Sequence, residues 1–134
     1  MREILFRGKE FYTGEWVEGY YVKGVTRHGI VKSFACHPRY GVIPETVGEF
    51  TGLTDKNGKK IFEGDICQIK GISYIDETPF VVEWNSEYSC WVWRELSFSS
   101  PSDTITPEIA KTAKVIGNIH DNPELLERSN ENAE

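Results

Sequence analysis

Apolar and polar residues alternate along this chain in short runs, and residues typical of turns separate one run from the next. Such alternation has the period of a half-buried β-strand. The pattern predicts strands at residues 4–7, 15–22, 30–34, 47–54, 59–62, 66–69, 80–84, 90–94 and 113–119. Long runs with helical spacing are almost absent, so the expected fold class is all-β, or β with minor helix.

Two short segments carry signals for the start of a helix. Thr106 precedes Pro107, and Asn122 precedes Pro123 and Glu124. A Thr or Asn cap followed by Pro at the first helical position is typical of a helix N-terminus. The second segment predicts a short C-terminal helix. With neither an internal repeat nor a linker, we expect one domain over residues 1–126 and a polar, disordered tail over 127–134.

The strongest local signal is Asn57-Gly58, which lies between two β-prone segments and predicts a hairpin. Two loop geometries compete. A two-residue turn at Asn57-Gly58 pairs Lys56 with Lys59. A type I turn from Asp55 to Gly58, with Gly58 left-handed as a bulge, pairs Asp55 with Lys59 instead.

The two geometries differ in strand register. The two-residue turn places Leu53 opposite Phe62, whereas the bulged turn places Leu53 opposite Ile61. Asp at the first turn position and Gly at the fourth favour the bulged form. That form also replaces a like-charge pair with an opposite-charge pair. We therefore expect the bulged turn.

Gly64 follows the hairpin closely and predicts a bend or bulge that redirects the chain into the next strand. A further hairpin is expected around residues 85–89. In its first strand Phe80, Val82 and Trp84 share one face, and in its partner Trp91 and Trp93 share one face. The expected architecture is thus a bent antiparallel sheet.

Charge and cysteine usage narrow the class of protein. The net charge of −6 opposes a nucleic-acid binder that acts by neutralising phosphates. The three cysteines are odd in number and scattered, as expected of free thiols in a reducing compartment. The N-terminus has no apolar run typical of a signal peptide, and no stretch approaches membrane-spanning length. These features predict a cytoplasmic location.

Three blocks of sequence resemble one known family. They are ILFRGK at 4–9, TVGEFTGLTDKNGKKIFEGDI at 46–66 and VIGNIHDNPELL at 115–126. In order and spacing they are similar to the YopX-like family, small proteins encoded by phages and prophages. The central block is long and highly specific. Within these blocks we take as structural motif residues Asp55, Asn57, Gly58, Gly64, Asp65, Gly117 and Asn118.

The resemblance implies a bifurcated sheet curled into a pseudo-barrel and a phage or prophage origin. It implies no established activity, substrate or catalytic residue, because the family is best described as a domain of unknown function.

Two groups of residues carry possible chemistry. Asp55, Glu63 and Asp65 are carboxylates that could act as acid and base in a hydrolase, or hold a divalent cation. The structural alternative, in which they satisfy backbone N–H groups at a turn and a bend, is favoured. A metal site would need to build on Cys36-His37, with further ligands from Cys67, Cys90, His28 or His120. The paired spacing of structural zinc sites is missing, so neither metal nor cofactor is expected. An enzyme is not the expected class of protein.

Aromatic residues are more numerous than one face of a small sheet needs. Together with nearby cations they could form a stacking platform for single-stranded nucleic acid. The alternative is core packing or burial at a contact between subunits. The candidate binding residues are Trp16, Tyr20, Tyr21, Trp91, Trp93 and Arg94.

From these features we expect an accessory protein that binds a host or phage protein or forms a homo-oligomer. A nucleic-acid-binding module on a barrel-like fold is the alternative, a hydrolase is third, and no membrane partner is expected.

Overall fold

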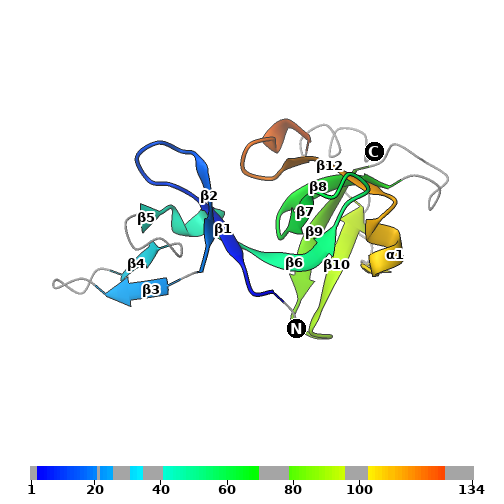
Figure 1. The fold of residues 1–134 in the computed structure, drawn as a ribbon, viewed down its shortest axis with the longest axis horizontal. Coiled ribbons are helices and arrows are strands. Elements are labelled where there is room, and N and C mark those ends of the chain that lie inside the picture. The colour runs from blue at the N-terminus through cyan, green and yellow to red at the C-terminus, as the bar shows by residue number, and fades with distance from the viewer. Residues whose placement is uncertain are drawn as a thin grey trace. The chain divides into compact units, whose positions relative to one another are not determined.

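The computed structural model describes residues 3–20, 22–25, 31–34, 41–69, 79–95 and 103–125 of the chain. The chain forms two compact units, Met1–Gly52 and Leu53–Glu134. Each unit is described by itself below. Figure 1 shows the strands and helices of both.

Strands dominate both units, as the alternating pattern predicted. In chain order the elements are β1 (Phe6–Lys9), β2 (Trp16–Gly19), β3 (Val22–Val25), β4 (Val31–Phe34), β5 (Gly41–Val42), the 3-10 helix η1 (Pro44–Thr46), β6 (Gly48–Thr54), β7 (Lys60–Phe62), β8 (Asp65–Ile69), β9 (Pro79–Asn85), β10 (Cys90–Glu95), β11 (Asp103–Thr104), α1 (Pro107–Ala110) and β12 (Ala113–Asn118). A helical turn follows at 123–125, where the C-terminal helix was predicted to begin.

The expected strand over residues 15–22 is divided into β2 and the start of β3. Gly19 is paired with Phe6, which is the first residue of β1. Beyond Gly19 the strand has therefore run past the end of its partner, and the chain leaves the ladder at Tyr20. Strand length here depends on the partner strand, which the pattern of one segment does not reveal.

In the first unit, β1 lies between β2 and β6, and β4 lies between β3 and β5. A bridge between Glu10 and Val42 links the two ladders. Gly8 faces Val42 so closely that an added Cβ would lie 3.1 Å from the Val42 Cβ. A glycine in β1 thus allows close approach of the two strands.

The hairpin that joins β6 to β7 has the bulged turn expected from the sequence. The Asp55 N–H donates to the Lys59 carbonyl at 2.8 Å, and the Gly58 N–H donates to the Asp55 carbonyl at 3.0 Å. Gly58 has a φ of +79°, in the left-handed region. This pairing, continued along the strands, places Leu53 opposite Ile61, and both side chains belong to one hydrophobic cluster.

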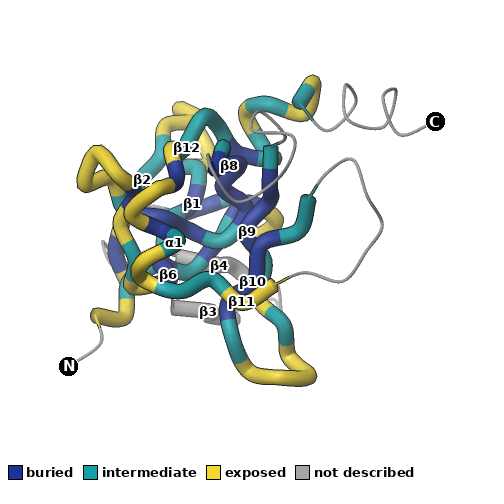
Figure 2. Tube along the Cα trace, turned by 90° about the vertical axis from the view of Figure 1, so that its right-hand side faces the viewer, coloured by how far each residue is buried: buried dark blue, intermediate teal, exposed yellow. Residues whose placement is uncertain are grey.

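The second unit is built on a five-stranded antiparallel sheet with the order β11-β10-β9-β8-β12. Trp84 pairs with Trp91 and Val82 with Trp93, as the expected hairpin around residues 85–89 requires. Figure 2 shows buried residues along β8 and β9. Residue Ile116 is a bulge in β12, because Val115 pairs with Cys67 and Gly117 pairs with Ile66.

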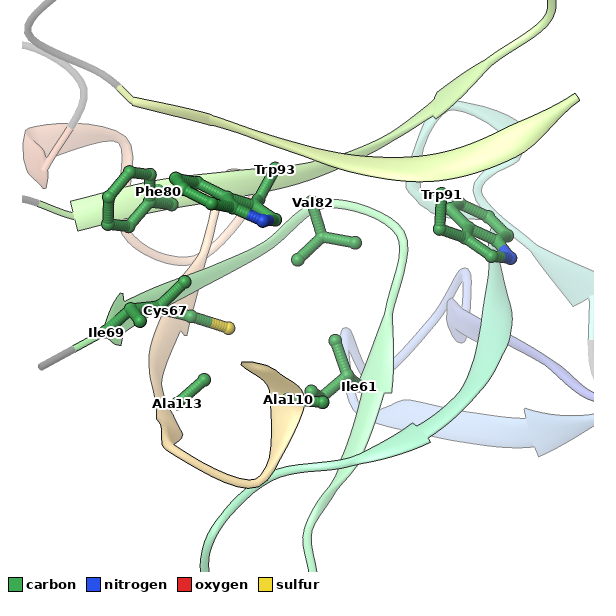
Figure 3. Close-up of a cluster of buried hydrophobic side chains, with 9 residues drawn as sticks. All are labelled: Ile61, Cys67, Ile69, Phe80, Val82, Trp91, Trp93, Ala110 and Ala113. Carbon is green, nitrogen blue, oxygen red and sulfur yellow. The ribbon is translucent and has the colours of Figure 1, made fainter. Parts of the chain in front are cut away.

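Side chains from this sheet form a hydrophobic cluster on one face and a smaller one around Ile66 and Val81 on the other. The larger cluster contains Phe80 and Val82 from the predicted face of β9 and Trp91 and Trp93 from that of β10. Trp84, the third residue predicted for the β9 face, is 41% exposed near the end of the strand. Figure 3 shows the nine buried members of the larger cluster: Ile61, Cys67, Ile69, Phe80, Val82, Trp91, Trp93, Ala110 and Ala113.

Helix α1 contributes Ala110 to this cluster and starts with the predicted cap. The Thr106 Oγ1 accepts a hydrogen bond from the Ile109 N–H at 3.2 Å, and Pro107 occupies the first helical position. The cap satisfies a backbone donor that has no partner inside a helix.

These elements confirm the predicted fold class, β with minor helix. The sheets of the described residues are not closed into a barrel: in each, the first and last strands lie at open ends of the strand order. Closure requires sustained pairing between first and last strands. In the five-stranded sheet β11 has only two residues and β12 is bulged, so neither edge offers a long regular ladder.

Candidate functional site

Asp55 holds the hairpin turn and attaches it to β12. One carboxylate oxygen accepts from the N–H groups of Asn57 and Lys59, at 2.8 and 2.9 Å. The other accepts from the Val115 N–H at 3.0 Å. Burial alone would raise the pKa of Asp55, but these three donors and the Lys59 charge outweigh it and lower the pKa. Both oxygens therefore have structural roles.

Asp65 closes the tight connection between β7 and β8. It is almost fully buried, and its carboxylate accepts from the Phe62 N–H at 2.8 Å. Gly64 has a φ of +89°, so the expected bend is present and needs a residue without a side chain. Glu63 is half-buried beside it. A hydrolase that uses Asp55, Glu63 or Asp65 loses support, because Asp55 and Asp65 are buried and bound to the backbone.

Gly117 and Asn118 organise the turn that follows β12. The Asn118 side-chain oxygen accepts from the N–H groups of His120 and Asp121, at 3.0 and 2.9 Å. The Asn118 N–H donates to the Asn122 side-chain oxygen at 3.1 Å. A Cβ on Gly117 would lie 2.4 Å from that same oxygen, so glycine leaves the space that Asn122 occupies.

The described residues contain no group of His, Cys, Asp and Glu side chains that could hold a metal ion. Cys36, His37 and His28 lie outside the described residues. Cys67 is buried in the larger hydrophobic cluster, and desolvation, followed by the nearby charges of Asp65 and Asp55, raises its pKa to about 12. Cys90 is half-buried, with its sulfur 3.7 Å from the Thr104 hydroxyl.

The candidate binding residues are divided between the two units. Trp91 and Trp93 are only 8% and 9% exposed, within the core of the second unit. Arg94, on the other face of the same strand, forms an ion pair with Glu83 at 3.0 Å. Tyr21 lies outside the described residues. Core packing, the alternative interpretation, therefore holds for the two tryptophans.

Trp16 and Tyr20 belong to the first unit. The Arg7 guanidinium carbon lies 4.6 Å from the centre of the Trp16 ring, and the Lys9 ammonium lies 5.6 Å from it. In the β1–β2 ladder Arg7 pairs with Glu18 and Lys9 with Trp16, so these side chains share one face. Trp16 is half-buried and Tyr20 is exposed.

The loop between β1 and β2 presents a pair of aromatic residues that the sequence analysis did not select. Phe11 is 65% exposed and Tyr12 is 89% exposed. Their rings meet edge to face, with centroids 5.4 Å apart. The loop is the blue one next to β1 and β2 in Figure 1. We refer to Phe11 and Tyr12 as the aromatic tip.

Hydrogen bonds hold this loop in shape. The Glu10 carboxylate accepts from both the N–H and the hydroxyl of Thr13. The Gly14 N–H donates to the Glu10 carbonyl at 2.9 Å, and Gly14 has a φ of +72°. The Phe11 N–H donates to the Gly41 carbonyl at 2.8 Å. The aromatic tip is thus displayed on an ordered turn.

One signal in the sequence could have identified the aromatic tip. Residues 8–14 separate two strand-like runs, and the turn residues Thr13-Gly14 follow directly after Phe11-Tyr12. A hairpin loop exposes its side chains, and an aromatic pair in a loop is therefore a surface feature. Phe11 and Tyr12 were not predicted as binding residues because they lie between the strand-like runs and not within them.

The family model described as YopX protein matches residues 5–127. The chain belongs to the YopX family. All three sequence blocks fall within the matched range, apart from one residue at its start. Membership agrees with the resemblance drawn from the hairpin block.

Among solved structures, one similar to this YopX family member is the crystal structure of protein EF1440 from Enterococcus faecalis. The two share 23% sequence identity, with a TM-score of 0.60, over 94% of this chain and 99% of that chain. At this identity the similarity establishes a shared fold. A comparison with curated proteins gave no match. In the described part of the chain, the helices are too short or too polar to cross a membrane.

Proposed function

We propose that this chain is an accessory protein of phage or prophage origin that binds another protein through the aromatic tip. The observation that carries the proposal is the exposure of Phe11 and Tyr12 on an ordered hairpin loop. Aromatic side chains are enriched at protein interfaces and supply much of their binding energy.

The order of the loop supports this use. Binding costs free energy when flexible side chains and loops must be immobilised. The Glu10 carboxylate and the Gly41 carbonyl already hold the loop backbone. Little ordering remains to be done when a partner covers the two rings.

Nucleic-acid binding, the alternative, has less support. Trp91 and Trp93 are buried, and the Trp16 ring already carries Arg7 and Lys9. A net charge of −6 also works against attraction to phosphates. A filter-binding titration with single-stranded and double-stranded DNA at low and high salt tests this alternative. Salt-sensitive binding that Arg7→Ala or Lys9→Ala weakens would favour it over the protein-binding proposal.

The main experiment compares the aromatic tip with an exposed aromatic elsewhere. The double variant Phe11→Ser/Tyr12→Ser removes both rings, and Tyr88→Ser removes one ring from the loop between β9 and β10, where Tyr88 is 74% exposed. Each full chain is used as bait in lysate of the source cell, and bound proteins are quantified by mass spectrometry. We expect a protein bound by the original chain and by Tyr88→Ser to be lost with the double variant. Equal recovery by all three chains would overturn the proposal.

The phage or prophage origin has its own test. Phage genes of related function lie in contiguous blocks, so the genes on either side of this one should encode phage proteins. A neighbourhood made up of chromosomal housekeeping genes would contradict this part of the proposal.

A further inference from the structure

The aromatic tip forms a convex, uncharged wedge. Residues 11–14 are Phe-Tyr-Thr-Gly, without a charged side chain. The two rings meet at an interplanar angle of 79°, so together they present one apolar mass rather than a flat platform. A convex apolar surface is complementary to a concave one, as in interfaces where an aromatic anchor fills a pocket.

A second copy of the chain is a poor partner for this surface, because two aromatic tips would bury too little surface area. Aromatic side chains offer about 150–250 Å² each, so exposures of 65% and 89% leave about 300 Å² on one tip. Two tips face to face would bury about 600 Å², half of the roughly 1,200 Å² at the lower end for specific interfaces. A pocket on a partner would surround the rings and contact the residues beside them, so it would bury more surface area than two tips face to face.

The cavity described in the second unit of another copy is also too small for the tip. The cavity in the larger hydrophobic cluster of the second unit has a volume of about 10 Å³. That space is about what one water molecule needs, far less than a phenyl ring. Insertion of the tip into this cavity of another copy is therefore disfavoured.

The charges near the tip distinguish a protein from a phosphate-bearing surface. Arg7 and Lys9 lie over the Trp16 ring, on the strands rather than in the loop. An anionic lipid surface or a nucleic acid would be met first by an uncharged tip on a chain of net charge −6.

We infer that the partner is a different protein with a concave apolar pocket, into which the rings of Phe11 and Tyr12 insert. This inference rests on the proposed function and adds the class of partner and the mode of binding. It makes Phe11 and Tyr12 the anchors of the interface, with Tyr12, the more exposed ring, placed deepest.

The test uses a photo-crosslinking residue in the full chain. Tyr12→p-benzoylphenylalanine places the reactive ketone in the tip, and Tyr88→p-benzoylphenylalanine is the matched control. Both chains are irradiated in lysate of the source cell, and cross-linked peptides are identified by mass spectrometry. The partner found is then purified and titrated with the original chain, Phe11→Ser/Tyr12→Ser and Tyr88→Ser. Parallel arms measure the mass of the chain by light scattering, and its sedimentation with vesicles of phosphatidylcholine and phosphatidylglycerol.

We expect one protein cross-linked from position 12 and not from position 88, with the attachment sites lining an apolar pocket. Binding should weaken at least about tenfold in the double variant and stay unchanged in Tyr88→Ser. Attachment to a flat or polar surface of a partner, or to a second copy with a dimer in light scattering, would overturn the inference while protein binding through the tip stands. Sedimentation with vesicles that depends on the tip, or partner binding that is unchanged in the double variant, would overturn both this inference and the proposed function.

Discussion

Asp55 connects the hairpin turn to a strand that lies 60 positions further along the chain. Its carboxylate accepts three backbone N–H groups, and the neighbouring Lys56 N–H donates to the Ala113 carbonyl at 2.9 Å. An ionised oxygen is the strongest acceptor for such donors. The residue that begins the turn therefore also attaches the turn to β12 within the second unit.

Replacing this carboxylate should destabilise the protein. In Asp55→Asn an uncharged amide has one acceptor oxygen for three donors, so we expect the free energy of unfolding to fall by about 2–4 kcal/mol at pH 7. Urea denaturation measures this. Asp103→Asn, at an exposed position in β11, is the matched control and should change stability little.

The same variant predicts a pH dependence. Because the pKa of Asp55 is lowered on folding, its contribution is present above the ordinary value of 3.8 and is lost as pH falls through the lower, folded value. The stability difference between the original chain and Asp55→Asn should therefore shrink as acid is added below pH 3.8. A difference that stays constant through this range would contradict the role assigned to the carboxylate.

Ser89 has a φ of +53°. Among the described residues, all others with a positive φ are glycines. A side chain in this left-handed region costs about 1 kcal/mol. Ser89→Gly should therefore raise the free energy of unfolding by about 0.5–1 kcal/mol, less than the full strain because glycine is freer when unfolded. Thermal unfolding provides the measurement. Ser86→Gly in the same loop should not stabilise, and equal stabilisation by both variants would refute the strain argument.

At the scale of elements, the β9–β10 hairpin shows whether its tryptophans are core residues or an exposed stacking surface. Trp93 packs edge to face on Phe80 at 4.3 Å, and Trp84 packs on Trp91 at 5.0 Å from a more exposed position. Burial makes Trp93 a core residue.

Two matched truncations test this assignment. Trp93→Ala should lower the free energy of unfolding by about 3–5 kcal/mol, and Trp84→Ala by about 1 kcal/mol. Chemical denaturation of both variants gives the comparison. If Trp93→Ala left stability intact, the residue would belong to a surface and the core assignment would fail.

The elements that sequence predicted well are those with local signals. The Asp55–Gly58 turn, the Thr106 cap and the alternation in β9 and β10 each depend on neighbouring residues. The division of β2 from β3 depends instead on where β1 begins, which is information from another segment. Strand closure is still less local, and the sheets of the described residues are not closed into a barrel.

The residues of the candidate site also differ in how well the sequence predicted them. Asp55 and Asp65 of the hairpin block were assigned structural roles from turn chemistry. In the structure Asp55 begins the turn and Asp65 begins β8, and both carboxylates accept from backbone N–H groups. The aromatic residues could not be sorted into core and surface, because alternation gives a face but not which face is covered. Trp93 is in the core, whereas Phe11 and Tyr12 were missed because their loop has no alternation.

At the scale of the whole molecule, the reactivity of the Cys67 thiol can be used to detect unfolding of the second unit. Its thiol is buried and has a pKa of about 12, so almost no thiolate exists near neutral pH. Iodoacetamide at pH 8 should alkylate the half-buried Cys90 in the native protein and leave Cys67 unmodified. In urea both should react. Peptide-resolved mass spectrometry separates the sites, and native alkylation of Cys67 at the rate of Cys90 would show that the cluster is open.

This labelling also bears on domain organisation. The expected single domain over residues 1–126 stays a prediction, since two compact units are present and β6 runs from one into the other. A shared strand is a route by which the two units could unfold together.

The bulged turn has a chemical consequence for the ageing of the protein. An Asn followed by Gly deamidates readily, because the Gly nitrogen can attack the Asn side-chain carbonyl, expel ammonia and form a cyclic imide that water opens. Here the Gly58 N–H is bonded to the Asp55 carbonyl, and the Asn57 N–H to the Asp55 carboxylate. A type I turn holds Asn57 with its ψ near zero, which turns the Gly58 nitrogen away from the side chain. Deamidation at Asn57 therefore proceeds mainly when the hairpin opens, and the amount of isoaspartate in a stored sample records how much time the hairpin has spent open.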